Sequence, residues 1–480
     1  MINTIKKYQS EYKMYPLATE IFADTTTPIN ILRKINEISD NFYLLESVEN
    51  SESLGRYSFL GFEPLLNIKY KNKITTISSN DLFLESTDDP INILREYVDK
   101  YKSPKIEGLP PFTGGFVGYM AYEMIGYAEP KLKLPINNFN DFEFQFFDKL
   151  IAFDNLKKKI IIIVNMKLDN IEKQYRKAKL EISKIINLIK SIDLPIKSNT
   201  PKIVNFHCNA DRDKFFKIVQ AAKQYITDGD IFQVVLSRRF EADFQGSLID
   251  AYRTLRVNNP SPYMYFIKSS NLEICGASPE TLVKVLNNKV TTFPVAGTRP
   301  RGKTLAEDLE FEKSLLVDEK ELAEHNMLVD LARNDIGKIS KYNSVKVDAY
   351  LKIHRYSKVM HIASIVSGQL KETFDSFDAI TSLLPAGTLS GAPKFRACEI
   401  IAELEKESRG IYGGAIGYID LSGNLDMCIA IRTAISDGKK VYVQAGAGIV
   451  YDSIEINEYQ ECENKAKAVM LAIENADHIE

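Results

Sequence analysis

Two separate stretches of the chain repeat apolar residues with the 3.6-residue period of an α-helix and carry acidic residues on the same side. The first predicted helix spans 319–336, and its apolar face consists of Ala323, Met327, Leu328 and Leu331. Glu324 falls among these residues and Glu321 at their edge. The second spans 458–473, with an apolar face of Cys462, Ala466, Val469, Ala472 and Ile473. The charged residues predicted within that second face are Glu458, Glu461 and Lys465.

Carboxylates that point toward a protein interior need partners, because an unpaired buried charge is very costly. The i, i+3 spacing lets both acids of each helix reach one site. Oxygen ligands from two facing helices suit Mg²⁺, which takes one or two carboxylates and keeps water or substrate oxygens. A buried salt bridge or an exposed helix edge would explain one such pair. Two pairs together with a lysine favour a metal site.

Strands with alternating polarity predict an antiparallel meander over 413–420, 425–436 and 440–445. The turns between them are Ser422-Gly423-Asn424 and Asp437-Gly438, and the Asp-Gly pair favours a type I′ hairpin.

Arg432 stands among small residues on one face of the middle strand, with Tyr412 or Gly413 expected opposite it. The third strand runs into Gly446 and Gly448, whose bare backbone can donate N–H groups to an anion. A salt bridge would explain the arginine alone, and a bulge would explain the glycines. Together they predict a carboxylate-binding site.

The chain divides, by composition, into two parts. An amphipathic helix predicted over 171–189 is followed by a polar, proline-containing stretch at 194–209, and a new helix begins near Asp211. We therefore predict an N-terminal domain at 1–195 and a C-terminal catalytic domain at 205–480, each of mixed strands and helices.

Composition excludes several classes of protein. With 480 residues and 45% hydrophobic side chains, the chain can bury a large core. The net charge of −3 gives no electrostatic signal for nucleic acid or anionic membrane. Five scattered cysteines form no Cys-x-x-Cys pair, which argues against a disulfide framework or zinc site. The polar start and the shortness of the aliphatic run at 160–164 predict a cytoplasmic protein.

One motif suggests a different class of protein. Residues 297–304 match the G-x-x-x-x-G-K-T pattern of phosphate-binding loops, which would indicate nucleotide binding. The loop has two arginines and a proline in its middle, and no apolar strand ending in aspartate is apparent to hold a metal. We therefore disfavour a nucleotide site.

Several long strings in the second half resemble those of the chorismate-utilising enzymes, and among these the large subunits of anthranilate synthases. The strings are GDIFQVV at 229–235, PVAGTRPR at 294–301, DEKELAEH at 318–325, LVDLARND at 328–335, PAGTLSGAPK at 385–394 and EYQECENK at 458–465. Weaker likenesses occur at 44–47, 55–58, 112–119 and 259–266. The resemblance implies an α/β protein of the α+β type, with large, mixed but mainly antiparallel β-sheets packed as a sandwich and helices outside.

The resemblance also implies roles for site residues. Mg²⁺ is expected to be held by Glu324 and Glu461, with Glu321 and Glu458 around it, and to grip the ring carboxylate of chorismate. The expected substrate-binding residues are Gln233, Thr298, Tyr412, Arg432, Gly446 and Gly448. Ammonia would add at C2 while the C4 hydroxyl departs, and Glu321 is the expected proton donor. His361 and Thr388 are expected to act in the loss of pyruvate, with Lys465 as an electrostatic partner.

By the same resemblance, the residues at two positions distinguish this chain from related chorismate-utilising enzymes. Isochorismate-forming relatives carry a water-activating lysine where this chain has Gln233, and aminodeoxychorismate-forming relatives carry a nucleophilic lysine where it has Ala296. Neither residue here can do that chemistry. The expected product is anthranilate, with aminodeoxychorismate or aminodeoxyisochorismate synthesis as alternatives. A catalytically idle regulatory relative is a further alternative.

Partners and regulation are likewise implied by the resemblance. None of the cysteines lies in a Gly-x-Cys-x-Gly elbow, so ammonia is expected from a separate glutamine amidotransferase subunit, in an assembly of two large and two small subunits. Feedback inhibition by L-tryptophan is also expected. The residues expected to bind tryptophan are Glu46, Ser47, Pro262, Tyr263 and Met264.

Overall fold

The protein, described by a computed structural model over residues 2–47, 55–192, 205–355 and 359–476, is built on two twelve-stranded β-sheets. Every strand pairing within the described residues is antiparallel. The predicted α+β class with large, mainly antiparallel sheets is therefore confirmed.

The first sheet joins strands from both ends of the sequence. Its strands, in spatial order, are β1 (Met14–Phe22), β10 (Lys159–Lys167), β9 (Lys149–Asp154), β3 (Tyr57–Phe62), β2 (Asn41–Glu46), β13 (Tyr263–Ser269), β14 (Leu272–Ser278), β23 (Thr433–Ser436), β24 (Lys440–Ile449), β12 (Gln233–Asp243) and β11 (His207–Cys208), with β20 (Gly391–Ala392) also paired to β12.

The second sheet is equally mixed in sequence. Its order is β17 (Val295–Pro300), β19 (Val359–Gln369), β16 (Lys289–Thr292), β15 (Thr281–Leu286), β22 (Leu425–Ile429), β21 (Ala415–Asp420), β7 (Gly115–Met120), β8 (Phe142–Phe147), β4 (Leu66–Lys71), β5 (Ile74–Ser78) and β6 (Phe83–Ser86), with β18 (Lys346–Arg355) paired to β19.

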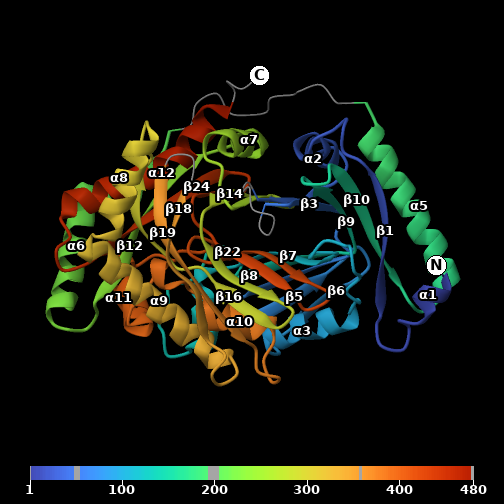
Figure 1. The fold of residues 1–480 in the computed structure, drawn as a ribbon, viewed down its shortest axis with the longest axis horizontal. Helices are drawn as coiled ribbons and strands as arrows, with labels where there is room; N and C mark the ends of the chain where they lie inside the picture. Colours follow the sequence, from blue (N-terminus) through green and yellow to red (C-terminus); the bar gives the residue numbers. More distant parts are fainter. Residues whose placement is uncertain (1, 48–54, 193–204, 356–358, 477–480) are drawn as a thin grey trace.

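Helices cover the outer faces of the two sheets (Figure 1). They are α1 (Ile2–Lys6), α2 (Pro28–Asn36), α3 (Pro90–Lys100), α4 (Ile125–Ala128), α5 (Ile171–Lys190), α6 (Arg212–Thr227), α7 (Ile249–Asn258), α8 (Leu305–Leu316), α9 (Glu319–Ile339), α10 (Ser376–Leu383), α11 (Lys394–Glu405) and α12 (Glu455–Glu474), together with the 3₁₀ turns η1 (Tyr122–Met124) and η2 (Gly387–Leu389).

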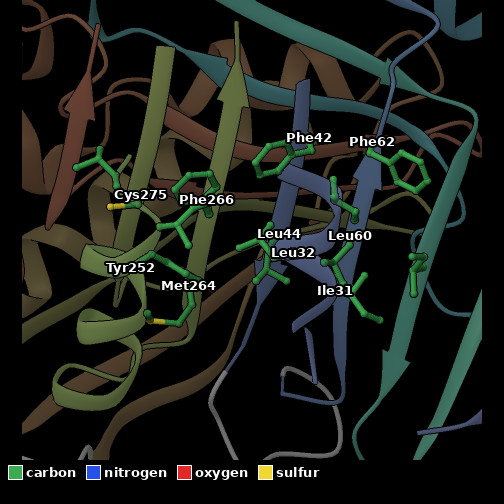
Figure 2. Packing of buried hydrophobic residues seen from close by; sticks show 14 of the residues in the cluster. Ile31, Leu32, Phe42, Leu44, Leu60, Phe62, Tyr252, Met264, Phe266 and Cys275 are labelled. Carbon is green, nitrogen blue, oxygen red and sulfur yellow. The ribbon is translucent and has the colours of Figure 1, made fainter. Parts of the chain in front are cut away.

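Apolar side chains fill the layers between these elements. Side chains of α2 and α7 pack on β2, β3, β13 and β14. Figure 2 shows Leu32 of α2 near Leu44, and Leu32, Leu44 and Phe266 are fully buried. A second cluster packs α3, α9 and α10 on the other sheet. A third, rich in tyrosine and phenylalanine, lies between the sheets and includes Tyr43, Phe112 and Tyr265. The layers are therefore helix, sheet, sheet and helix.

Both sheets run across the division predicted at 195/205. β2 pairs with β13 in the first sheet, and β7 pairs with β21 in the second. The boundary itself falls in 193–204, outside the described residues, so the two-domain division stays a prediction.

The meander predicted near the C-terminus is present, with two local differences. The middle strand is broken between β22 and β23, because the chain leaves the second sheet there and enters the first. The Asp437-Gly438 hairpin also forms, and the Asp437 carboxylate accepts the amides of Lys439 and Lys440. Of the two turn residues Asp437 and Gly438, only Gly438 has a positive φ, of 85°. A type I′ turn needs a positive φ at both residues, so the predicted turn type was wrong.

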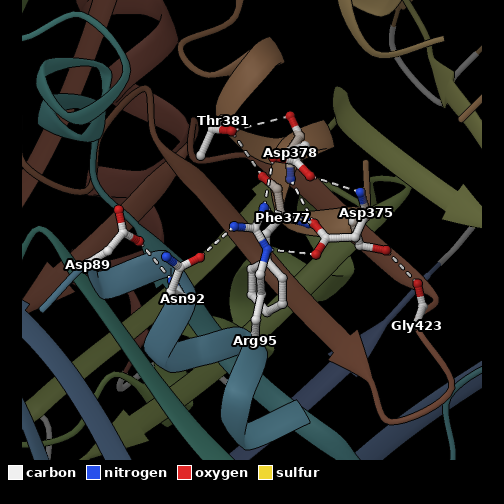
Figure 3. Close-up of polar contacts among 9 residues, drawn as sticks. Asp89, Asn92, Arg95, Asp375, Phe377, Asp378, Thr381 and Gly423 are labelled. Atoms are coloured by element: carbon white, nitrogen blue, oxygen red, sulfur yellow. Dashed lines mark hydrogen bonds and ion pairs between the residues drawn. The ribbon is translucent and has the colours of Figure 1, made fainter. Parts of the chain in front are cut away.

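An arginine links the N-terminal half to a helix of the C-terminal half (Figure 3). Arg95 of α3 donates from Nε to Asp375 at 2.7 Å and from Nη2 to Asp378 at 2.7 Å. The same Asp375 side chain caps α10 by accepting the amides of Phe377 and Asp378. The arginine thus fixes the start of α10 against α3.

We predict that Arg95→Met lowers the free energy of unfolding by about 1 kcal/mol, because the ion pairs are partly exposed and therefore screened. Urea unfolding at low and high salt measures the loss, which shrinks as salt rises. Arg333→Met is the matched control, since its pair with Asp330 is exposed at both ends, and it should change stability by roughly 0.5 kcal/mol or less. Equal losses in the two variants would contradict the proposed link.

Candidate active site

The helices α9 and α12 form as predicted, but α9 is rotated relative to the expected orientation. Its buried residues are His325, Leu328, Val329, Asp335, Ile336 and Ile339. The buried face therefore centres near His325, whose Nε2 lies 2.7 Å from Ser364 Oγ, and Ala323 is exposed. Glu321 and Glu324 are half-buried at the edge of this face. The expectation that Glu324 lies in the middle of the buried face was wrong, because a hydrogen-bonded histidine occupies it.

On α12 the apolar face is the predicted one, and the charged residues flank it. Cys462, Ala466, Val469, Ala472 and Ile473 are buried. Glu458 is half-buried, whereas the side chains of Glu461 and Lys465 are 46% and 45% exposed. The expectation that all three charged residues lie within the buried face was wrong. They occupy its margin, where long side chains can reach solvent.

Among the candidate metal-binding acids, Glu324, Glu321 and Glu461 have charged or polar partners. Gln233 Nε2 donates to Glu324 Oε1 at 3.2 Å, and Arg299 Nη1 donates to Glu321 Oε1 at 3.3 Å. Lys465 Nζ lies 2.6 Å from Glu461 Oε1 and donates to the carbonyl of Gly446 at 3.0 Å. Lys465 therefore connects α12 to β24.

Like charges also meet on each helix. Burial raises the pKa of Glu321, and the nearby Glu324 carboxylate raises it further. Burial likewise raises the pKa of Glu458, with a further increase from Glu461 and an opposing effect of Lys320 on α9. A cation would relieve this repulsion. The pairs Glu321/Glu324 and Glu458/Glu461 are therefore each electrostatically suited to bind a cation.

The donor set fits a hard divalent ion that takes few ligands from the protein. The candidate ligands are carboxylate oxygens, which suit such an ion. Within the described ranges, no three His, Cys, Asp or Glu side chains converge as a ready-made metal cage. An ion at this place would take only one or two protein carboxylates, and it would compete with Lys465 and Arg299 for them.

Arg432 lies where the chain passes from the second sheet to the first. Its φ is +50°, and it stands between β22 and β23. Two backbone hydrogen bonds hold the chain just before Arg432. Gly413 N–H donates to Ala430 O at 2.9 Å, and Ala430 N–H donates to Gly414 O at 2.8 Å. Burial lowers the pKa of Arg432, opposed by the charge of Glu280, and the guanidinium remains a cation near neutrality.

The two predicted glycines of β24 make room for side chains from other elements. A Cβ on Gly446 would lie 2.8 Å from the Tyr412 hydroxyl, and a Cβ on Gly448 would lie 2.7 Å from Gln233 Nε2. Tyr412 is buried, and its hydroxyl therefore approaches the backbone of β24 closely. Tyr412, Gln233 and the two glycines therefore lie together.

Glu280, which the sequence reasoning missed, is at the centre of the site. It accepts a hydrogen bond from Thr388 Oγ1 at 3.0 Å. Burial raises its pKa, while Thr388, Lys465 and Arg432 lower it. The residue follows Pro279 between β14 and β15, one strand from each sheet. A single acid between two apolar strands was the available signal, and a search confined to helix faces overlooks it.

His361 lies on β19, opposite Thr298 of β17. Its Nδ1 is 3.0 Å from the carbonyl of Gly297 and 3.0 Å from Thr298 Oγ1. A carbonyl can only accept, so Nδ1 carries the proton and Nε2 is the basic nitrogen. Burial lowers the pKa of His361, and the charges of Arg432 and Lys465 add to this effect. The imidazole is therefore neutral near pH 7.

These electrostatic effects place the separate segments in one site. Arg432 and Lys465 act on both Glu280 and His361, although the four residues come from distant parts of the sequence. Gln233 reaches Glu324, and Thr388 reaches Glu280. A cation-rich centre with a protonatable carboxyl and a neutral imidazole can bind an organic anion and move protons on it.

The residues expected to bind tryptophan lie at the junction of β2 and β13. Met264 pairs with Glu46 across these strands. The Glu46 carboxylate accepts from Arg256 Nε at 2.8 Å and Tyr252 Oη at 2.8 Å, and Ser58 Oγ donates to it at 3.3 Å. Tyr263 Oη donates to Asp426 at 2.8 Å. Pro262 is buried, and Ser47 is half-buried.

The loop that resembles a phosphate-binding motif is occupied by its own chain. Gly302 N–H donates to Asp308 Oδ1 at 2.6 Å, and Lys303 N–H donates to Glu307 Oε2 at 2.6 Å. Arg301 also pairs with Asp308 at 2.6 Å. The amides that would hold a phosphate already bind carboxylates, so the nucleotide alternative is not supported.

In the part of the chain that the structure describes, no helix is both long enough and apolar enough to traverse a bilayer.

Comparison with known proteins connects this site to a family. A model for chorismate binding enzymes matches residues 40–471. The anthranilate synthase component 1 of Acetivibrio thermocellus is 46% identical over 491 aligned positions, covering 100% of this chain and 99% of that protein. The protein of the same name from Aquifex aeolicus is 44% identical, covering 99% of this chain and 98% of its own.

Solved structures give the same result. Anthranilate synthase component I from Streptococcus pneumoniae superimposes with a TM-score of 0.76 at 39% identity, covering 94% of this chain and 98% of that one. MenF, the menaquinone-specific isochorismate synthase of Escherichia coli, has a TM-score of 0.71 at 17% identity, with 98% of each chain covered, and at that identity it shares the fold alone.

Proposed function

The chain belongs to the chorismate-binding enzymes, and we propose from this premise that it is the lyase of an anthranilate synthase, converting chorismate and ammonia to anthranilate and pyruvate. One observation carries the proposal: the charges of Arg432 and Lys465 act on both Glu280 and His361, so the four side chains belong to one site. This arrangement suits a dianion that must lose a hydroxyl and then a pyruvate.

Two groups bind the two carboxylates of chorismate. Arg432, the Tyr412 hydroxyl and the amides near Gly446 and Gly448 hold the enolpyruvyl carboxylate. Glu324 and Glu461 would hold a divalent ion, in our proposal Mg²⁺, with Glu321 and Glu458 beside them. When bound, the ion supplies positive charge to the ring carboxylate. Gln233 bonds to Glu324 and Thr298 bonds to His361, so both are placed to contact the substrate in our proposal.

In the first step, ammonia forms a bond to C2 while the C4–O bond breaks and the ring double bonds shift. The C4 hydroxyl leaves as water, which requires a proton. We favour Glu280 over the Glu321 expected from sequence, because Glu280 is half-buried and bonded to Thr388, whereas Glu321 is paired with Arg299. Burial raises the pKa of Glu280 and so favours its protonated form, while Thr388, Lys465 and Arg432 act in the opposite direction.

In the second step, the C2 proton is removed, the C3–O bond breaks and the ring becomes aromatic. His361 is the base, since its lowered pKa keeps Nε2 unprotonated near neutral pH. The enolpyruvate released takes up a proton to give pyruvate. Lys465 stabilises the negative charge that develops, and Thr388 orients Glu280.

We propose that a separate glutamine amidotransferase subunit supplies the ammonia. In our proposal two chains of each kind associate in the cytoplasm, and L-tryptophan inhibits by binding near Glu46, Ser47, Pro262, Tyr263 and Met264. Because Arg256 and Tyr252 already bind the Glu46 carboxylate, tryptophan would have to share or displace them. The N-terminal part, 1–195, contributes β2 to this place.

We expect the purified chain to form anthranilate and pyruvate in equal amounts from chorismate, MgCl₂ and ammonium salt. Anthranilate fluorescence and lactate-dehydrogenase-coupled pyruvate detection measure the two products. Isochorismate or aminodeoxychorismate as the sole product would replace the proposal with a sibling reaction, and no product from a folded chain would indicate an idle relative.

Glu324→Ala and Glu461→Ala should each lower turnover at least about 100-fold, because each removes a carboxylate that binds the divalent ion. Titration calorimetry with MgCl₂ and chorismate should show weaker ion binding in both variants. Glu319→Ala, on the exposed side of α9, is the matched control and should leave both measurements unchanged. Full Mg²⁺-dependent turnover in the first two variants would contradict the assignment.

Glu280→Gln should lower the amination rate by about 10²- to 10⁴-fold, because glutamine keeps the shape but cannot donate the proton. For the wild type, the rate should fall as pH rises through the raised pKa of Glu280. Glu321→Gln serves as the comparison and should cost less than about 10-fold. If Glu321→Gln shows the larger loss, Glu321 is the acid.

A further inference from the structure

Arg409 is a buried cation that none of the roles above uses. It follows α11, and its side chain is 1% exposed. Nε and Nη2 donate to the two oxygens of Glu405 at 2.9 Å and 2.6 Å. The remaining contacts are to backbone carbonyls, with Nη1 to Leu389 O at 2.5 Å and Nη2 to Val235 O at 2.6 Å. The guanidinium therefore joins three separate segments.

The backbone at Arg409 is held by another acid, which is half-buried. Glu123, in η1, accepts the amide of Arg409 at 2.7 Å and the amide of Gly410 at 3.0 Å. The amide of Tyr122 donates to Gly410 O at 2.8 Å. Burial raises the pKa of Glu123 to about 7. The segment after α11 is thus fixed from the N-terminal half of the chain.

Each contact of Arg409 lies next to a residue of the proposed site. Leu389 follows Thr388, which binds Glu280. Val235 lies two residues after Gln233 and pairs with Gly448 across β12 and β24. The guanidinium carbon also lies 4.7 Å from the Tyr122 ring centroid and 5.9 Å from that of Tyr412. The Tyr412 hydroxyl in turn approaches the backbone at Gly446.

Glu405 balances the buried positive charge and extends the contacts. Its Oε1 also accepts the amide of Ser237 at 2.7 Å and the Ser237 hydroxyl at 2.9 Å. Ser237 pairs with Gly446 on β24. Together, Glu405 and Arg409 bind β12 at two points, Val235 and Ser237, which face the two glycines.

We propose that Arg409 is a positioning residue, which sets the distance between the η2 turn bearing Thr388, the β12–β24 strands bearing Gln233 and the glycines, and the Tyr412 ring. A planar guanidinium has donors in fixed directions, so it holds several carbonyls in one geometry. Lysine has a single ammonium group and cannot span the same set. The inference rests on the proposed function, since these walls are the ones assigned to the enolpyruvyl carboxylate and to proton transfer.

The test uses the full-length chain with ammonium salt and three variants. Arg409→Lys keeps the charge and Glu405→Gln keeps the shape of its partner. The double variant Arg409→Met with Glu405→Gln removes the buried ion pair, while glutamine still accepts from Ser237. Replacing both charges avoids leaving one buried alone, which preserves folding better than a single deletion. Arg396→Lys, on the exposed side of α11, is the matched control.

We expect the KM for chorismate to rise and kcat/KM to fall about 10- to 100-fold in Arg409→Lys and the double variant, because the walls are displaced by a fraction of an ångström. The share of aminated intermediate released before pyruvate loss should also rise, since Thr388 shifts relative to Glu280. Glu405→Gln should show smaller changes in the same direction. Thermal midpoint and circular dichroism report the folded fraction.

Two outcomes would overturn the inference. In the first, the folded variants keep the wild-type KM and product ratio. In the second, activity falls only in proportion to the folded fraction, as a purely structural residue predicts. If Arg409→Lys and the double variant do not fold, Glu405→Gln decides by the same two measures. Failure of the wild type to make anthranilate would instead contradict the proposed function.

Discussion

The site depends on the passage of the chain from one sheet to the other between Ile429 and Thr433. A continuous strand would keep Arg432 within a single sheet. The break places Arg432 where its charge acts on Glu280, between β14 and β15, and on His361 of β19. The positive φ of Arg432 is the backbone conformation that accompanies this crossing, an unusual one for a side chain of that size.

Burial then controls the chemistry of the charged groups at the crossing. Loss of water raises the pKa of Glu280 and lowers that of His361, so both favour their neutral forms. The cations Arg432 and Lys465 remain nearby and attract an anionic substrate. The two shifts run in opposite directions for an acid and a base in one site, which is the pairing needed for an acid step followed by a base step.

A layer of fixed polar contacts lies behind these groups. Backbone atoms of β12, η2 and the segment before β21 form hydrogen bonds with the side chains of Arg409, Glu405 and Glu123. These bonds fix the distances between the three segments. Other arrangements of these groups are disfavoured, because they would leave a buried donor or carbonyl without a hydrogen bond, which is costly.

By itself, the sequence determined the helices α9 and α12 and the strands of the C-terminal meander, because periodicity and turn residues act locally. The grouping of Glu324, Glu461, Lys465, Arg432 and the two glycines in one site came from the family resemblance and stays a prediction. Only the tertiary structure decided which face of α9 is buried, since the bond between His325 and Ser364 joins residues far apart in sequence. It alone revealed Glu280 and Arg409 as well. Their significance comes from contacts with Thr388, Leu389 and Val235, and no local pattern records which strands a fold brings together.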